Sequence, residues 1–269
     1  APASGTNPLG YLGGGRDAGG TPVSTVDKID YSNDTATASV AGSLTDGKRG
    51  VGAAGNNFFA YFAGGNSPSA GSVSSIDRLD YSSDSTDTLS KGNLSFSNYG
   101  LDGVGNANFG YFASSDYPVL STVNRVDYSN DTATAVVKGP LTNPVDYGAA
   151  AGNQSFGYFA GGGSPLPGGG RTTIDRIDYS NDTPTASPKG PLQAVKRAFA
   201  ATGNASFGYW GGGYSGPSQT TTIDRLDYSS DTSTSLKGPL SIQRVHHSAV
   251  GNASYGYFAG GEVPSVKQQ

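Results

Sequence analysis

The sequence repeats one pattern at an interval of about 50 residues. An Asp-Tyr-Ser tripeptide recurs with its tyrosines 47 to 51 residues apart, at Tyr31, Tyr81, Tyr128, Tyr179 and Tyr228. A second, aromatic and glycine-rich element occurs six times, with its tyrosine at Tyr11, Tyr61, Tyr111, Tyr158, Tyr209 and Tyr257. A fixed period of this length indicates one supersecondary unit per repeat, which buries its apolar surface against neighbouring units.

Each unit has the pattern of four short strands. In the unit at 147–192, these strands are expected at 147–153, 155–162, 173–179 and 185–192, separated by Gly, Pro or Asn-Asp turns. In the second strand, Phe156 and Tyr158 point to one face while Phe159 points to the other. Apolar groups on both faces of a strand indicate that both faces of the sheet are covered. A small sheet packed on both sides and repeated in a ring is a propeller blade.

The sequence therefore predicts an all-β fold, a single β-propeller that occupies 1–269. We expect about five four-stranded blades, with six possible, and a ring closed by the N- and C-terminal strands. The units are expected at approximately 9–44, 50–94, 99–141, 147–192 and 198–240, with a partial unit at 243–261.

The four strands of the repeat unit do not occur equally often in the sequence. The second strand of the unit occurs six times, but the other three strands are clear only five times. The strand at 248–252 is expected to close the ring by joining the first unit, which leaves either 9–14 or 255–260 over. That strand could pair with another molecule, because an unpaired strand edge is a template for association. It could also form an incomplete sixth blade on its own ring.

The repeat resembles the Kelch repeat in three features. These are the apolar run ending in Gly-Gly, a tyrosine about 15–20 residues later and a Pro-Leu after it. The resemblance covers essentially the whole chain and implies a propeller. One feature departs from the family: Kelch units carry a Trp on the fourth strand, whereas the single tryptophan here, Trp210, lies on a second strand.

Composition limits the class of function. Charged residues are 14% of the chain, the net charge is −4 and no basic run occurs, so nucleic-acid binding is not expected. No apolar stretch reaches 18 residues, so membrane insertion is not expected either. The chain has no Cys and no Met, and it is rich in Gly and Tyr. We expect an extracellular, cell-surface or virion location, and the Ala1-Pro2-Ala3 start indicates a processed N-terminus.

Catalytic, cofactor and metal sites are not expected. His246 and His247 are the two histidines, and adjacent residues on a strand point to opposite faces. Copper-radical oxidases that share Kelch-type propellers need a Cys-linked Tyr and several histidines, and this chain has no Cys. The glycine-rich segments 161–163 and 168–173 precede a strand and not the helix of a phosphate site. The acids of 178–182 lack the spacing of a calcium loop and favour turn capping.

A regular charge pattern recurs on the third strand. A basic residue is followed two positions later by an acid, and we predict a structural ladder of hydrogen-bonded ion pairs within or between blades. The pairs are Arg78 and Asp80, Arg125 and Asp127, Arg176 and Asp178, Arg225 and Asp227.

Binding residues are expected in the loops between the second and third strands, which vary while the strands repeat. The candidates there are Tyr117, Tyr214 and Arg171. The predicted function is that of a non-enzymatic structural or adhesive subunit, which associates with other proteins or with its own copies as an oligomer or filament. The alternative is a carbohydrate-binding, lectin-like propeller, because exposed tyrosines can stack on sugar rings.

Overall fold

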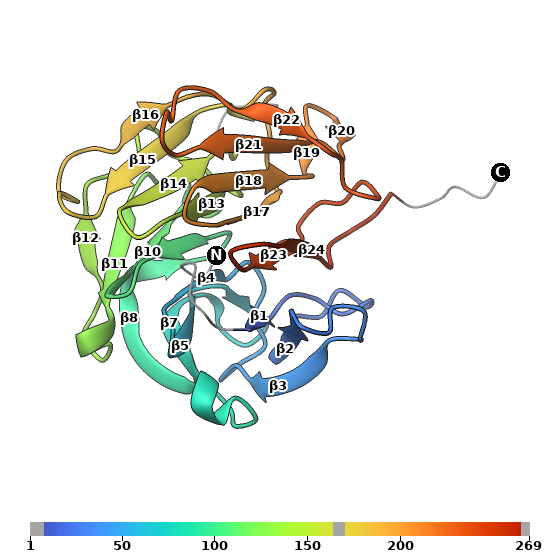
Figure 1. Cartoon of the computed structure of the whole chain (residues 1–269). Coiled ribbons are helices and arrows are strands. Elements are labelled where there is room, and N and C mark those ends of the chain that lie inside the picture. The colour runs from blue at the N-terminus through green and yellow to red at the C-terminus, as the bar shows by residue number, and fades with distance from the viewer. Residues whose placement is uncertain (1–7, 164–169, 265–269) are drawn as a thin grey trace.

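Small antiparallel sheets are arranged around a common centre in the computed structural model, which describes residues 8–163 and 170–264 (Figure 1). Apart from two short 3-10 turns at Tyr81–Ser83 and Tyr128–Asn130, the regular elements of these residues are all strands. The predicted all-β propeller is therefore confirmed.

Four sheets follow the predicted meander, in which each strand pairs with the next. Blade 2 contains β4 (Gly52–Gly55), β5 (Phe59–Ala63), β7 (Gly71–Asp80) and β8 (Leu89–Asn98), with the short β6 (Asn66–Ser67) beside β7. Blade 3 contains β9 (Asp102–Gly105), β10 (Phe109–Ala113), β11 (Val123–Asp127) and β12 (Val136–Lys138). Blade 4 contains β13 (Ala149–Gly152), β14 (Phe156–Ala160), β15 (Ile174–Asp178) and β16 (Ser187–Lys189). Blade 5 contains β17 (Ala200–Gly203), β18 (Phe207–Gly211), β21 (Ile223–Asp227) and β22 (Ser235–Lys237), with a small hairpin of β19 (Tyr214–Ser215) and β20 (Ser218–Gln219) between β18 and β21.

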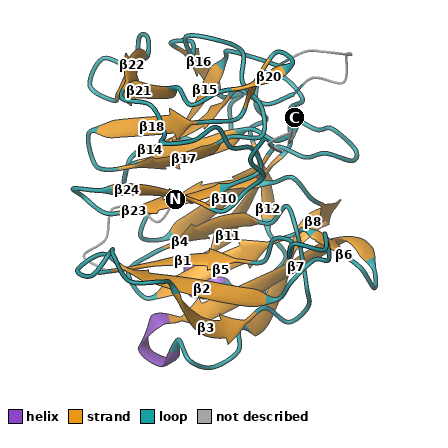
Figure 2. Cartoon of the chain, turned by 90° about the vertical axis from the view of Figure 1, so that its right-hand side faces the viewer, coloured by secondary structure: helices purple, strands orange, loops and turns teal. Residues whose placement is uncertain are grey.

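The two ends of the chain form smaller sheets. Blade 1 is three-stranded, with β1 (Leu9–Gly13), β2 (Thr25–Asp30) and β3 (Ser39–Ser43). We call the two-stranded sheet of β23 (Ser248–Gly251) and β24 (Gly256–Ala259) half-blade 6. Figure 2 shows half-blade 6 lying between blade 5 and blade 1. The molecule thus has five blades and a sixth position that holds two described strands.

Ring closure differs in one respect from the expectation. The strand at 248–252 does not join the ladder of blade 1; instead β23 pairs with β24, and β1 pairs with β2. The reason is local: a tight turn, in which Asn252 N donates to Tyr255 O over 2.9 Å, brings β24 directly onto β23. The N- and C-terminal sheets still close the ring by packing, because Tyr257 of β24 stacks on Tyr31 of blade 1 at 5.3 Å between ring centroids.

The inner strands explain the small residues of the sequence. Strands β4, β9, β13, β17 and β23 lie side by side in this order around the centre. A Cβ atom at Gly103 would overlap the carbonyl of Ala53 on the neighbouring inner strand. The second strands supply large side chains between blades: Phe62, Phe112 and Trp210 are almost fully buried. Trp210 also donates its Nε1 hydrogen to the carbonyl of Ala149 in blade 4 over 3.1 Å. Small inner residues and large second-strand residues therefore pack each blade against the next.

Candidate interaction site

A set of polar contacts joins each blade to the next. Asp131, in the turn after the third strand of blade 3, accepts hydrogen bonds from two side chains of blade 2: Tyr61 at 3.0 Å and Arg78 at 2.7 Å. Lys91, on the fourth strand of blade 2, is 3.3 Å from the other carboxylate oxygen. One acid thus receives a tyrosine, an arginine and a lysine of the preceding blade.

The same arrangement recurs around the ring. Asp84 binds Tyr11 and Lys28; Asp182 binds Tyr111, Arg125 and Lys138; Asp231 binds Arg176 and Lys189. Burial by itself would raise the pKa of Asp182, but the hydrogen bonds from Tyr111 and Lys138 and the charge of Arg125 lower it overall. Asp182 is therefore an ionised acceptor, and the four acids together join each of blades 1 to 4 to the next.

The predicted partner within the charge ladder was wrong. The acid two positions after each base does not bind that base; Asp178, for example, accepts hydrogen bonds from the Ser180 amide at 2.9 Å and the Ser180 hydroxyl at 2.7 Å. These two bonds lower the pKa of Asp178. The counterparts behave in the same way, with Asp80 on Ser82, Asp127 on Ser129 and Asp227 on Ser229. The physical reason is that the acid ends its strand and caps the following turn, while Arg78, Arg125 and Arg176 extend to the next blade.

The repeated tyrosines stack across the same interfaces. The second-strand tyrosine of one blade lies on the Asp-Tyr-Ser tyrosine of the next, as Tyr158 lies on Tyr228 at 4.7 Å with an interplanar angle of 8°. The other stacked pairs are Tyr11 with Tyr81, Tyr61 with Tyr128, Tyr111 with Tyr179, and Tyr257 with Tyr31. The two tyrosine series that define the period are thus the two halves of one inter-blade contact.

Blade 5 carries the same groups but they face half-blade 6. Among the described residues, Arg225 and Lys237 form no ion pair, and Tyr209 has no stacked tyrosine. Tyr209 is partly exposed, whereas Tyr61, Tyr111 and Tyr158 are 0% exposed. We call Tyr209, Arg225, Lys237 and Gly238 the open flank of blade 5.

The glycine of the open flank gives independent evidence that no described residue fills the position beside it. In blade 4, a Cβ atom at Gly190 would overlap the Thr232 carbonyl of blade 5, and the Gly190 amide donates to Asp231 O over 3.1 Å. At the equivalent Gly238, no atom of the described residues lies within 4 Å of such a Cβ. The flank therefore has the shape that receives a blade, and no described strand forms the outer half of a blade beside it.

Strand β24 supplies the adjoining edge. It pairs with β23, and among the described residues no strand pairs with its other side (Figure 1). In blade 4, the equivalent side of β14 pairs with β15, where Arg176 lies 4.4 Å over the ring of Phe156. The residue equivalent to Phe156 is Tyr255, which is 62% exposed. Half-blade 6 thus presents both a free backbone edge and an uncovered aromatic ring.

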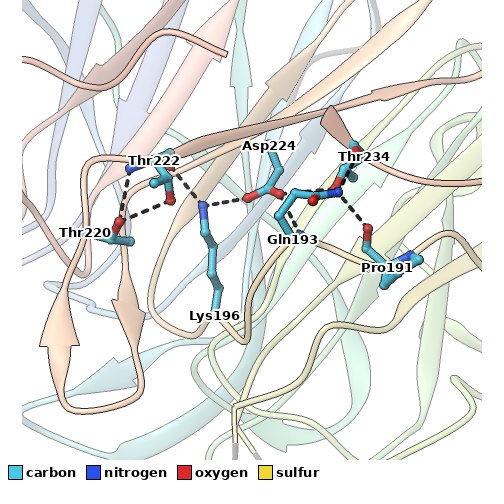
Figure 3. A network of polar contacts seen from close by, with 7 residues as sticks. All are labelled: Pro191, Gln193, Lys196, Thr220, Thr222, Asp224 and Thr234. Carbon is cyan, nitrogen blue, oxygen red and sulfur yellow. Dashed lines mark hydrogen bonds and ion pairs between the residues drawn. The ribbon is translucent and has the colours of Figure 1, made fainter. Parts of the chain in front are cut away.

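Blade 5 is held internally by a buried ion pair that the sequence reasoning did not identify (Figure 3). Lys196 and Asp224 are 2.7 Å apart and nearly fully buried, and burial lowers the pKa of Lys196. Lys196 also donates to the Thr222 carbonyl at 2.9 Å, while the Gln193 amide donates to Asp224 at 2.8 Å. A second such pair joins Lys48 to Asp77 in blade 2. These contacts anchor the segment that leads into the inner strand.

The three loop residues predicted to bind ligand lie in different loops. Tyr117 of blade 3 is 77% exposed. Arg171 of blade 4 forms a backbone bridge to Lys196. Tyr214 of blade 5 is half-buried, with the Arg197 guanidinium 5.0 Å from its ring centroid and His246 at 6.4 Å. Among these three, the described ring contacts place Tyr214 in an aromatic cluster.

That cluster lies where the chain enters the inner strands. Tyr147 and His246 have left-handed backbones, with φ of 45° and 51°, and their rings meet edge to face at 5.2 Å. The Tyr147 hydroxyl donates to Asp116 at 2.7 Å. Sequence reasoning named Tyr214 but did not name Tyr147 and His246 as binding residues. One signal was present: two other units have Gly50 and Gly100 at the position of Tyr147 and His246, also with positive φ. Side chains at such positions are strained, and strain of this kind is found at functional sites.

A cavity of about 180 Å³ lies at the centre, lined by the inner strands and by β1. Most of the residues that line it are apolar, but they include Asp102 and His247. Burial raises the pKa of Asp102 to about 7 and lowers that of His247 to about 4. No group of three potential ligand side chains is placed to hold a metal ion within residues 8–163 and 170–264. Over the same residues, no helix has the length and apolar character that a bilayer crossing requires.

Comparison with known proteins supports the fold alone. No model of a known protein family matches the chain, and no curated protein matches it. Among solved structures, the chain is similar to the propeller YjhT, with a TM-score of 0.76 and 11% sequence identity over 98% of this chain and 90% of that one. At this identity the likeness extends to the blade arrangement and not to a site. The resemblance to Kelch repeats in particular stays a prediction.

Proposed function

We propose that this protein is a non-enzymatic propeller that serves as a structural or adhesive subunit and binds other polypeptides by strand addition at half-blade 6. The observation that carries the proposal is the exposed outer edge of β24, beside the open flank of blade 5. Addition of a strand to such an edge provides backbone hydrogen bonds for affinity and side-chain slots for specificity.

The character of the edge supports this role. Folded proteins usually protect edge strands with charged residues, proline or a covering segment. Strand β24 reads Gly-Tyr-Phe-Ala and contains no charge and no proline. The backbone groups of Gly256 and Phe258 point away from β23, because ladder partners alternate along an antiparallel strand. These groups are available to a partner strand.

We also propose an extracellular, cell-surface or virion location. The low content of charged residues and the surplus of Ser, Thr, Asn, Tyr and Gly support this setting. The residue types also support a non-catalytic role. The chain has no Cys, and its two histidines have different neighbours: the His246 ring contacts Tyr147, and the His247 ring contacts Phe258.

A second candidate function is carbohydrate binding at the aromatic cluster. Tyr147, Tyr214 and His246 combine aromatic faces with the charged Arg197 and Asp116, which is the chemistry that sugar rings bind. The strained backbone of Tyr147 and His246 favours this candidate, since the strain persists only where the surrounding structure holds these side chains in place.

Two binding assays separate the candidates. Random peptides displayed on phage are selected on the immobilised protein, and hydrogen–deuterium exchange then locates the selected peptides. We expect enriched, strand-forming peptides that slow exchange at the amides of Gly256, Phe258 and Gly260. Absence of enrichment, or protection elsewhere than on β24, would overturn strand addition. A glycan array run in parallel tests the second candidate, with Tyr147→Ala as the variant that should lose sugar binding.

A further inference from the structure

The closed interfaces show which partner the open flank is built to receive. At three interfaces, an arginine of one blade binds an Asp of the next blade. In each case this Asp lies three residues after the tyrosine that stacks across the same interface. In blade 5, these residues are Tyr228 and Asp231, and they bind Tyr158 and Arg176 of blade 4. The open flank repeats the receiving groups as Tyr209 and Arg225. Its specificity is therefore for an aromatic ring and a carboxylate at this spacing.

The open flank also contains the lysine and the backbone donor of the closed interfaces. Lys189 is 3.4 Å from Asp231, and the Gly190 amide donates to the carbonyl of the same Asp. Lys237 and Gly238 are their counterparts in blade 5. In blade 4, two cations and one amide thus converge on Asp231, which is the geometry of charge-assisted carboxylate recognition, and blade 5 carries the same three groups.

Half-blade 6 specifies the strand that precedes this acid. In blade 4, β15 runs antiparallel to β14, with Arg176 opposite Tyr158 and over Phe156. The equivalents on β24 and the turn before it are Tyr257 and the exposed Tyr255. A strand with an arginine at this register would cover Tyr255 by a cation–π contact.

We propose, building on the strand addition proposed above, that half-blade 6 binds a segment of the repeat's own type on another polypeptide. The segment reads aliphatic-Asp-Arg-aliphatic-Asp-Tyr-Ser-x-Asp. It lies antiparallel to β24, with its arginine over Tyr255, its tyrosine on Tyr209 and its last aspartate between Arg225 and Lys237. Binding completes a sixth blade from two chains.

Residues 1–269 hold no spare segment of this type. The acids of its five Asp-Tyr-Ser-x-Asp segments are all engaged within the ring, by Tyr257 for Asp34 and by the preceding blades for the others: Asp84, Asp131, Asp182 and Asp231. The residues outside the described ranges contain no Asp, Glu, Tyr or Arg. A segment of this type on a separate polypeptide is the occupant that we propose.

A synthetic peptide with the sequence of residues 173–189 tests the proposal against the full-length protein. Binding of the fluorescein-labelled peptide is followed by anisotropy, and a dissociation constant on the order of 10–100 μM is expected for a short flexible strand. The variant Arg225→Ala should weaken binding about tenfold or more, because one charge-assisted contact is lost. The matched control Arg16→Ala, which removes an exposed arginine of blade 1, should leave it within about twofold.

A double-mutant cycle makes the assignment specific. The peptide change Asp182→Ala should weaken binding to the wild-type protein. It should have little further effect on binding to the Arg225→Ala variant, because the arginine that contacts this aspartate is already removed. Equal binding of both peptides, an unchanged dissociation constant in Arg225→Ala, or no binding at about 1 mM peptide would overturn the proposal. Near-ultraviolet circular dichroism establishes that each variant is folded.

The outcomes separate this proposal from the function on which it rests. If phage-selected peptides protect β24 but the 173–189 peptide does not bind, the repeat-type segment is wrong while strand addition stands. If neither protects β24, both are wrong.

Discussion

Arg176 and Asp231 lie 55 residues apart in the sequence, yet Arg176 Nη1 is 2.6 Å from Asp231 Oδ2 across the interface of blades 4 and 5. The same arginine lies over the Phe156 ring of its own blade. Arg225 has the equivalent position over Phe207 but no acid among the described residues. The protein therefore contains a matched pair of sites, one filled and one open, and several predictions use this contrast.

Arg176→Ala should lower the free energy of unfolding by about 1–3 kcal/mol, because the partly buried Asp231 loses its closest charged partner. Arg225→Ala should lower it by less than about 1 kcal/mol, since among the described residues that arginine lies over the Phe207 ring and binds no acid. Urea denaturation of both variants measures the difference. Equal losses would show that the inter-blade bond to Asp231 does not contribute.

Tyr111→Phe should cost about 1–2 kcal/mol, because the buried hydroxyl that donates to Asp182 at 2.9 Å is removed. It should also raise the pKa of Asp182, which this hydrogen bond helps to lower. Tyr209→Phe is the matched control at the open flank, and its effect should stay within about 0.5 kcal/mol. A large loss in Tyr209→Phe would mean that Tyr209 already has a partner.

Lys196→Ala should cost about 3–5 kcal/mol, because Asp224 would remain buried without its counter-ion. The double variant Lys196→Asn with Asp224→Asn should recover part of this loss. It copies blade 3, where Asn98 and Asn124 occupy the same two slots and are both buried. Melting temperatures of the single and double variants test this, and a double variant less stable than Lys196→Ala would contradict it.

Asp102 should make stability depend on pH. Its folded pKa of about 7 is above the ordinary value of 3.8, so this group favours folding below about pH 4, and the benefit is lost as pH rises to 7. His247 acts in the opposite direction, because its folded pKa of about 4 is below 6.5. Asp102→Asn should therefore make stability rise more steeply from pH 4 to 7 than in the wild type. Urea denaturation across this range checks the slope, and parallel curves would exclude a raised pKa.

The purified protein should contain no stoichiometric copper or zinc. The chain has no Cys, and its two histidines have different neighbours. Elemental analysis measures this directly, and one equivalent of either metal per chain would contradict the non-enzymatic proposal.

The local features of the fold could be predicted from the sequence. The period of the tyrosines defined the blades, and the alternation of Phe156, Tyr158 and Phe159 indicated sheets covered on both faces. The inner strands were recognisable from small residues such as those of β13. These features depend on neighbours within a few residues, so periodicity and turn chemistry are sufficient to identify them.

Contacts between blades could not be predicted in the same way. The sequence showed that Arg176 and Asp178 recur together, but it did not show that the arginine binds Asp231 of the next blade while Asp178 caps its own turn. The left-handed Tyr147 and His246 were likewise missed, because their meeting depends on the packing of blades 4, 5 and 6.

The sequence by itself determined that this chain forms a ring of small β-sheets, because each repeat encodes its strands and turns locally. Only the tertiary structure decided that β23 pairs with β24 and not with blade 1, and that no described residue gives Tyr209 and Arg225 the partners of their counterparts. The reason is that a repeat specifies what its flank can receive, whereas the closure of the ring decides which flank is filled.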